Sequence, residues 1–197
     1  MDLPPQVIEL GDVTLRRFDR DADLQELCQV IEESLEHLRP WMPWVAGHGP
    51  ARTAEFLARR EEAWERGREF TYAIVLGGAV VGACQLFLRD DGPANGRELG
   101  YWLHPAATGR GLATRAARAL VDQAFRFPGV DHVEVVHDPA NRASGAVPSR
   151  LGFTALSRTD TGEYQVWRLT RDLLPDEVEE ELRETFRTVG EDPASDS

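Results

Sequence analysis

The chain is poor in cysteine and has no long hydrophobic run. Its two cysteines, Cys28 and Cys84, lie inside apolar segments and away from any cluster typical of a metal site, so we interpret them as small buried side chains. Such sparse usage suits a reducing compartment. No apolar run approaches the ~18 residues that a membrane helix needs. The start, Met1-Asp2-Leu3-Pro4-Pro5, lacks the basic and apolar regions of a signal peptide. We therefore expect a cytoplasmic protein with no membrane partner and no metal.

Positive charge is also scarce. The chain of 197 residues has 22 Lys and Arg against 34 Asp and Glu, which gives a formal net charge of −12. Nucleic-acid binding normally needs a basic face, so this balance argues against a nucleic-acid partner. Residues 171–197 hold ten acids and three arginines, so this segment carries 3 − 10 = −7 and the rest carries −12 − (−7) = −5. A negative body favours cationic substrates, and amines are of that kind.

The length suits a single domain, since domains usually contain ~100–200 residues. We expect this domain to span residues 1–174. Residues 175–197 are expected to form an acidic tail, helical from about Pro175 to Val189 and disordered after that.

Hydrophobic periodicity predicts strands and helices in alternation. The predicted strands are 13–18, 70–76, 79–88, 97–104, 132–137, 153–157 and 164–169, and the predicted helices are 24–35, 51–66, 111–127 and 140–151. Asp19 or Asp21 is expected to cap the first helix, and Gly77-Gly78 is expected to form a hairpin turn. The order of elements mixes hairpins with one helical crossover, which indicates an α+β fold with a mixed sheet.

The segment from Glu98 to Thr114 carries the strongest functional pattern. It reads as a strand, then a short loop containing Gly109 and Gly111, then a helix start. The first turn of a helix leaves main-chain N–H groups unpaired, and together with the helix dipole they form an anion site. A ligand bearing phosphate is one interpretation. The other is a tight turn that needs glycine for positive φ. The spacing fits neither a P-loop nor a dinucleotide-binding fingerprint.

Three blocks of this sequence resemble the GNAT acetyltransferases, in particular the branch that includes RimJ and RimL. They are 98–105 followed by 109–114, then 141–144 followed by 151–153, and the Trp-Met-Pro-Trp stretch at 41–44. The resemblance covers residues 13–170. It implies a GNAT fold with a mixed sheet of six to seven strands flanked by about four helices. It also implies acetyl-CoA as cosubstrate, an amine acceptor such as a peptide N-terminus, and a possible homodimer.

The resemblance also implies a cofactor site. The loop 106–111 would hold the CoA pyrophosphate, and the strands around Trp102 and Val135 would splay apart to admit the pantetheine arm. The residues implied to bind the cofactor are Trp102, Leu103, His104, Thr108, Gly109, Arg110, Gly111, Leu112, Ala113, Thr114 and Asn141. Two positions depart from the general GNAT pattern. Ala106 stands where Gln or Arg is usual, and Pro148 stands where a tyrosine general acid is often found.

Acyl transfer to an amine needs a group that takes a proton from the amine and a group that gives one to the leaving sulfur. We predict Glu98 as the base, and its alternative is a solvated glutamate at a strand end. We predict Ser144 as the acid, and its alternative is a hydroxyl bonded to its own helix turn. His104 and His137 are further candidates for proton transfer.

Trp41, Trp44 and Glu98 are the predicted acceptor-binding residues, and packing of a loose loop is the alternative for the two tryptophans. An α-amino group with a pKa of ~8 is about one-tenth neutral at pH 7, so a weak base suits it better than it suits a lysine amine. The sequence predicts direct acetyl transfer in a ternary complex. Another acyl donor such as succinyl-CoA, an antibiotic or polyamine acceptor, and a non-catalytic acyl-CoA sensor remain alternatives.

Overall fold

A computed structural model gives the fold, and it describes residues 3–88, 95–157 and 162–173. The predicted acidic tail, residues 175–197, lies outside these ranges. The strands of the described residues are β1 (Val7–Leu10), β2 (Val13–Arg17), β3 (Glu69–Leu76), β4 (Ala79–Phe87), β5 (Gly96–Leu103), β6 (His132–His137), β7 (Thr154–Ala155) and β8 (Gln165–Thr170). The helices are α1 (Leu24–Leu38), α2 (Pro50–Glu65), α3 (Leu112–Ala124) and α4 (Arg142–Arg150), with short 3-10 turns η1 (Pro43–Val45), η2 (Pro105–Ala107) and η3 (Arg171–Leu173).

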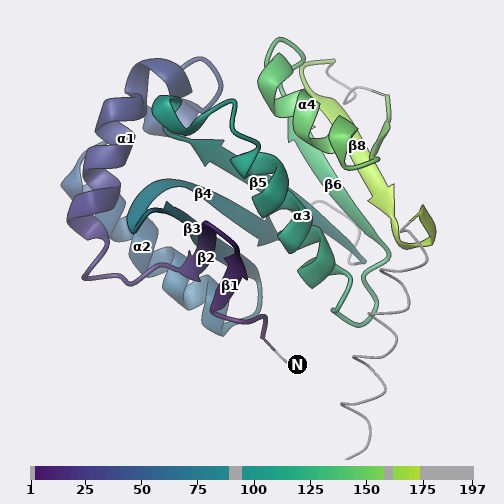
Figure 1. Ribbon diagram of the computed structural model, residues 1–197, viewed down its shortest axis with the longest axis horizontal. Helices are drawn as coiled ribbons and strands as arrows, with labels where there is room; N and C mark the ends of the chain where they lie inside the picture. Colours follow the sequence, from purple (N-terminus) through teal and green to yellow (C-terminus); the bar gives the residue numbers. More distant parts are fainter. Residues whose placement is uncertain (1–2, 89–94, 158–161, 174–197) are drawn as a thin grey trace, which may run out of the picture.

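All eight strands form one sheet in the order β1-β2-β3-β4-β5-β6-β8-β7. Every pairing is antiparallel except that of β5 with β6, which is parallel. Figure 1 shows this mixed sheet running through the molecule, with the helices on its two sides. The sheet confirms the predicted α+β class, and it has one strand more than the upper end of the predicted range.

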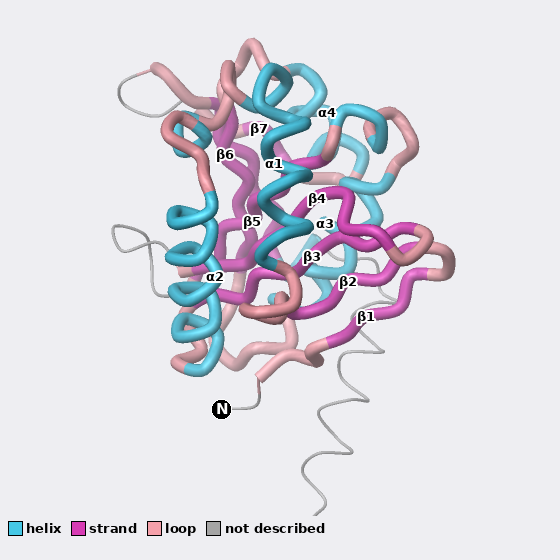
Figure 2. The backbone as a smooth tube through the Cα atoms, turned by 90° about the vertical axis from the view of Figure 1, so that its left-hand side faces the viewer, coloured by secondary structure: helices cyan, strands magenta, loops and turns pink. Residues whose placement is uncertain are grey.

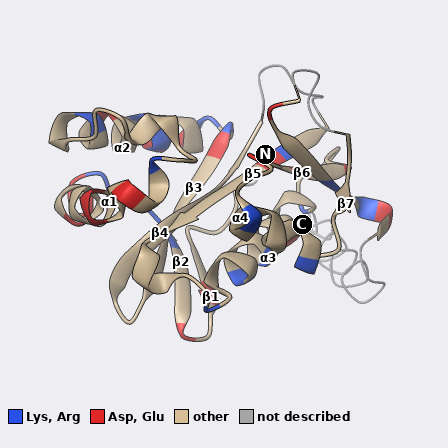
Figure 3. Ribbon diagram, turned by 90° about the horizontal axis from the view of Figure 1, so that it is seen from above, with Lys and Arg blue, Asp and Glu red and all other residues tan. Residues whose placement is uncertain are grey.

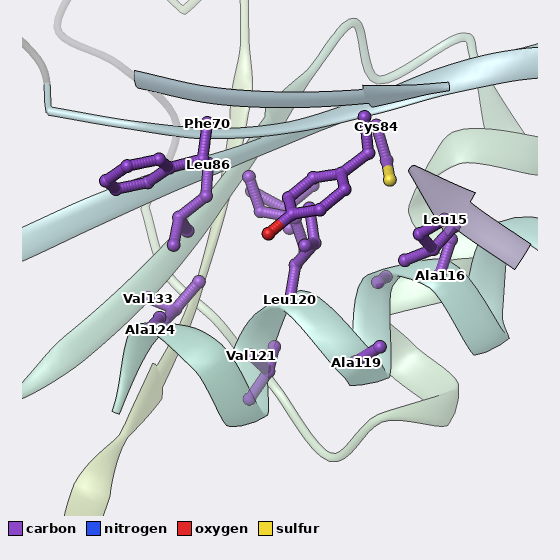
Figure 4. Close-up of a cluster of buried hydrophobic side chains, with 14 of the residues drawn as sticks. Leu15, Phe70, Cys84, Leu86, Ala116, Ala119, Leu120, Val121, Ala124 and Val133 are labelled. Atoms are coloured by element: carbon purple, nitrogen blue, oxygen red, sulfur yellow. The ribbon is translucent and has the colours of Figure 1, made fainter. Parts of the chain in front are cut away.

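The sheet separates two hydrophobic layers, because alternate residues of a strand point to opposite faces. On one face, α3 packs its apolar stripe of Ala116, Leu120 and Ala124 against the central strands. Figure 4 shows this stripe facing Leu15, Phe70, Cys84 and Leu86 across the core. On the other face, Leu27 and Ile31 of α1 and Leu57 of α2 pack over β3 and β4. Figure 2 shows α1 and α2 side by side on this second face.

The parallel contact between β5 and β6 is short. Paired residues run only from Gly96 with His132 to Glu98 with Glu134. After that point the two strands diverge, as Figure 1 shows toward the upper part of the view, so Trp102 and Val135 belong to separated segments. This opening agrees with the splay that the family resemblance implied, and it positions the site.

Two local details differ from the sequence predictions. β1 was not predicted, because its four residues lie at a sheet edge and remain partly or fully exposed. Helix α1 begins after Asp23, and neither Asp19 nor Asp21 is its N-cap. Asp19 instead accepts main-chain hydrogen bonds from Asp21 at 3.0 Å and Ala22 at 2.8 Å, which forms the turn before the helix.

Within the described residues, no helix has both the length and the apolar character needed to cross a membrane. In the same part of the chain, no group of three or more His, Cys, Asp or Glu side chains is arranged to hold a metal ion.

Candidate active site

The open edge of β5 is the first feature of the site. The N–H of His104 donates to the Val81 carbonyl of β4 at 2.8 Å. In an antiparallel pair, only alternate residues exchange hydrogen bonds with the partner strand. Trp102 therefore directs its main chain to β4, whereas Tyr101 and Leu103 direct theirs to the side that β6 has left. Of the three residues predicted to contact the pantetheine arm, Trp102 and His104 therefore direct their main chain to β4, whereas Leu103 directs its main chain to the open side. The contact itself stays a prediction.

The loop after β5 leads into a helix start of the predicted kind. Thr108 donates its hydroxyl to the Pro105 carbonyl at 2.8 Å, which closes the η2 turn. Gly109 and Gly111 have φ values of 72° and 73°, a region that side chains with a Cβ rarely adopt. Gly111 is the N-cap of α3 and is exposed. The first N–H groups of α3, those of Leu112, Ala113 and Thr114, therefore have no partner within the helix.

Two arginines flank this helix start and have different environments. Arg115 pairs with Asp12 at 2.8 Å and donates to the Leu10 carbonyl, so it ties α3 to the β1–β2 turn. The hydrogen bond from Arg115 holds the pKa of Asp12 below its usual value, with a smaller contribution from Arg110. Arg110 is exposed on the loop itself. Arg110 is therefore the guanidinium placed to meet an anion at the helix N-terminus.

His104 links this loop to α1. Its Nδ1 accepts a hydrogen bond from the Ala106 N–H at 3.2 Å, and its Nε2 lies 3.3 Å from Glu33. The ring thus stabilises the turn on one side and contacts an acidic residue of α1 on the other. His137 is also engaged at both nitrogens, by the Asp138 carbonyl at 2.7 Å and by the Trp167 indole N–H at 2.9 Å.

The Asn141–Ser144 turn opens α4 beside β6. The Asn141 side chain accepts a hydrogen bond from the Ser144 N–H at 3.1 Å, as an N-cap residue does. Within the described ranges, the hydroxyl of Ser144 forms no hydrogen bond with another residue. It is therefore not bonded to a carbonyl of its own helix turn. Its availability is what the predicted role as proton donor requires.

Pro148 lies inside α4 and leaves the Ser144 carbonyl without its usual helical partner. A proline has no N–H to donate to the carbonyl four residues earlier, and its ring crowds that oxygen. The hydroxyl of Tyr101 donates to the same carbonyl at 2.8 Å instead. Burial raises the pKa of Tyr101 to about 12, so the hydroxyl keeps its proton. A tyrosine of β5 thus reaches the turn where the general GNAT pattern has a tyrosine on the helix.

Glu98 lies at the point where β5 and β6 part. It is partly buried, and it shares its face of the sheet with Gly100 and Trp102. Its neighbour across the strand pair is Glu134, which accepts a hydrogen bond from Arg168 at 2.9 Å. Because Arg168 compensates the charge of Glu134, a second carboxylate can stand beside it.

A cavity of about 410 Å³ lies on this same face, between the sheet and helices α1 and α2. Its lining includes Trp44 and Trp102, whose ring centroids are 6.1 Å apart. Gly100 and Gln85 also line it, and the missing side chain of Gly100 leaves room for that of Gln85, whose amide nitrogen would lie 3.1 Å from a Cβ at this position. Of the predicted acceptor residues, Trp44 therefore borders the cavity, whereas Trp41 and Glu98 do not. Glu98 lies two residues along β5 from the cavity floor.

Sequence reasoning missed two groups of residues here. Tyr101 was overlooked because its link to Ser144 joins residues that are 43 positions apart. The cavity is also bordered by Arg52, Arg59 and Arg60 of α2. The helix pattern of 51–66 predicts which residues face the core, and it contains no signal for which polar residues border a cavity.

Comparison with known proteins agrees with this geometry. Residues 12–154 match the family model described as acetyltransferase (GNAT) domain. YdaF of Bacillus subtilis (strain 168), a provisionally assigned ribosomal N-acetyltransferase, is 26% identical over 156 residues, which are 77% of this chain and 83% of YdaF.

Two solved structures have a similar fold. RimL, a ribosomal L7/L12 alpha-N-protein acetyltransferase in complex with coenzyme A, has a TM-score of 0.75 at 19% identity, over 84% of this chain and 98% of that one. Mycobacterium smegmatis RimJ in complex with CoA-disulfide has a TM-score of 0.71 at 25% identity, over 89% and 90%. The chain belongs to the GNAT acetyltransferase family, and it is an acyltransferase.

Proposed function

We propose that this enzyme transfers the acetyl group of acetyl-CoA to the free α-amino group of a protein N-terminus. The observation that carries the proposal is the opening where β5 and β6 diverge, which lies between two features of the molecule. On one side lies the start of α3 with its exposed N-cap Gly111, and on the other lies a cavity bordered by tryptophans. A thioester in the opening would be within reach of an amine in the cavity.

The donor site follows from the chain's own groups. The N–H groups that start α3, with Arg110, would hold the CoA pyrophosphate by charge and hydrogen bonding. The free main chain of Tyr101 and Leu103 would pair with the amide groups of the pantetheine arm. Asn141 would flank that arm from the N-terminus of α4. RimL and RimJ have coenzyme A or CoA-disulfide bound in their structures, which supports the same class of donor here.

The chemistry needs two proton transfers. The neutral amine attacks the thioester carbonyl, a C–N bond forms, and the C–S bond breaks to release the CoA thiolate. Glu98 would accept the amine proton through a water, since it lies outside the cavity lining. The free hydroxyl of Ser144 would donate a proton to the thiolate and regain one from solvent.

The acceptor class is the finer part of the proposal. RimL and YdaF carry names that refer to ribosomal N-acetylation, and this supports a protein N-terminus. The α-amino group also suits the site, because its pKa of ~8 leaves more neutral amine at pH 7 than a lysine side chain does. A cytoplasmic location and a homodimer remain predictions, which fractionation and gel filtration would test.

Thiol release from acetyl-CoA tests the proposal against a panel of peptides with free N-termini, N-terminally blocked lysine peptides, polyamines and aminoglycosides. We expect release only with free N-termini. The Glu98→Gln and Ser144→Ala changes should each lower kcat, and full turnover after both changes would refute the assigned roles. Acetyl-CoA binding without release for any amine would favour the sensor, and release from succinyl-CoA alone would favour another donor.

A further inference from the structure

The mouth of the acceptor cavity is basic, although the chain as a whole carries −12. α1 contributes the apolar residues Leu27 and Ile31 to the lining. Four residues of α2, namely Arg52, Glu55, Arg59 and Arg60, supply the fixed charges. α2 as a whole carries three arginines and four glutamates, and Figure 3 shows acidic residues on α1, which runs beside it.

Not all of these charges are available to a substrate. Arg60 forms an ion pair with Glu69 and lies over the Phe56 ring at 4.9 Å, so its charge is compensated. Arg52 donates to the Ala46 carbonyl at 3.1 Å, a neutral group that leaves the charge in place. Among residues 3–88, 95–157 and 162–173, no carboxylate pairs with the exposed Arg59.

Cys84 and Tyr101 of the lining add no charge at neutral pH. Burial raises the pKa of the Cys84 thiol and raises that of Tyr101 to about 12, so both stay protonated and neutral. The Nε2 of His48 lies 3.1 Å from the Cys28 carbonyl and faces it as a donor. Among the arginine and glutamate side chains of the lining, Arg52 and Arg59 therefore stand against one carboxylate, Glu55, which gives 2 − 1 = +1.

The floor and the mouth of the cavity suit different parts of a peptide. Trp44, Trp102 and Phe56 line it with aromatic surface, which favours the first residue of the acceptor next to the reacting amine. Each further residue of an extended peptide advances ~3.3–3.6 Å. The side chains of the second and third residues would thus pass the guanidinium groups of α2, where carboxylates form charge-assisted hydrogen bonds.

The same charges act on the amine. A positive neighbour disfavours the ammonium form, lowers the amine pKa and increases the neutral fraction that can attack. A polyamine or an aminoglycoside brings several positive charges to the same mouth and is repelled. The local charge therefore opposes the preference for cationic substrates that the net charge of the body had indicated, because solvent ions screen distant charges beyond ~8 Å at physiological salt.

We propose that the acceptor is a peptide whose free α-amine is followed by acidic residues at its second and third positions, and that Arg52 and Arg59 select it. This inference rests on the proposed N-terminal acetyltransferase function. One unit charge at ~6 Å in a water-like dielectric changes a rate by about threefold. Two arginines would then favour an acidic over a neutral peptide by about tenfold in kcat/KM, and repulsion by Glu55 reduces this to between about threefold and tenfold, mainly through KM.

The experiment compares three peptides of equal length that begin Ser-Asp-Glu, Ser-Ala-Ala or Ser-Lys-Lys, using thiol release from acetyl-CoA at low and high salt. We expect the order acidic, neutral, basic, with a smaller spread at high salt. Arg59→Glu should lower kcat/KM for the acidic peptide by about tenfold and raise it for the basic one. Arg59→Gln changes the charge by one unit instead of two, so it should lower kcat/KM for the acidic peptide by about threefold.

Arg66→Glu is the matched control, because it makes the same change in net charge outside the cavity. Arg66 is exposed at the end of α2 and pairs with Glu62 at 2.6 Å. It should leave the order of the peptides unchanged. Equal rates for the three peptides would overturn the inference and leave the proposed function standing. Turnover of none of them would overturn both.

Discussion

The hydrogen bond from Tyr101 to the Ser144 carbonyl leads to a prediction for Tyr101→Phe. The change removes one hydroxyl and leaves the ring in its packing. Because Pro148 supplies no N–H, the Ser144 carbonyl then has neither its side-chain donor nor a main-chain donor four residues later. An unpaired, partly buried carbonyl costs about 1–3 kcal/mol. For a domain of this size, such a loss lowers Tm by about 2–12 °C.

Tyr101→Phe should lower kcat more than a substitution far from the site that lowers the free energy of unfolding by the same amount. Ser144 is held by two contacts, the cap from Asn141 and the bond from Tyr101. Loss of the second loosens the turn that carries the proposed proton donor, so we expect kcat to fall by about tenfold. The KM for acetyl-CoA should change less, because the N–H groups at the start of α3 are untouched.

A second variant separates this explanation from a general loss of packing. Pro148→Ala restores an N–H that can donate to the Ser144 carbonyl in the ordinary helical manner. In the Tyr101→Phe background it should therefore recover about 1 kcal/mol of stability and most of kcat. Thermal unfolding and steady-state kinetics of the wild type, both single variants and the double variant give the coupling. Strictly additive effects would refute the reasoning.

Three further changes test the loop, the cap and the β1–β2 contact. Gly111→Ala, at a φ of 73°, should cost about 1 kcal/mol and weaken CoA binding, measured by calorimetry, whereas normal binding would contradict the assigned anion site. Asn141→Ala should lower stability by about 1 kcal/mol and lower kcat, and unchanged values in melting and thiol-release assays would exclude the cap. The pKa of Asp12 is lowered on folding, so its contribution is complete above its unfolded value and lost as pH falls through the folded one. Asp12→Asn should therefore flatten the acid side of the stability profile below about pH 4, and an unchanged acid slope would count against the pair with Arg115.

Much of the fold could be predicted because local signals and tertiary packing agree. The Gly77-Gly78 hairpin has positive φ at both residues, and the apolar stripe of α3 is buried as its periodicity predicted. The glycine loop before α3 was found for the same reason, since a positive φ and a helix start are both local properties.

Other parts of the site depend on contacts that no local pattern encodes. The hydrogen bond between Tyr101 and Ser144 forms because the fold brings β5 and the start of α4 close together. The sequence around Pro148 shows only that the Ser144 carbonyl lacks a main-chain N–H donor. Which residues of α2 border the acceptor cavity depends on how that helix rotates against α1 and the sheet. Trp41 and Trp44 look alike in sequence, and the η1 turn directs only Trp44 to the cavity.

The most direct test of the central claim is to locate the transferred acetyl group. The enzyme would be incubated with isotope-labelled acetyl-CoA and an acidic peptide that carries both a free α-amine and one lysine, and the product sequenced by tandem mass spectrometry. The enzyme itself contains no lysine, so its own side chains add no ε-acetyl background. We predict label on the α-amine alone. Label on the lysine, or on neither amine, would contradict the proposed function.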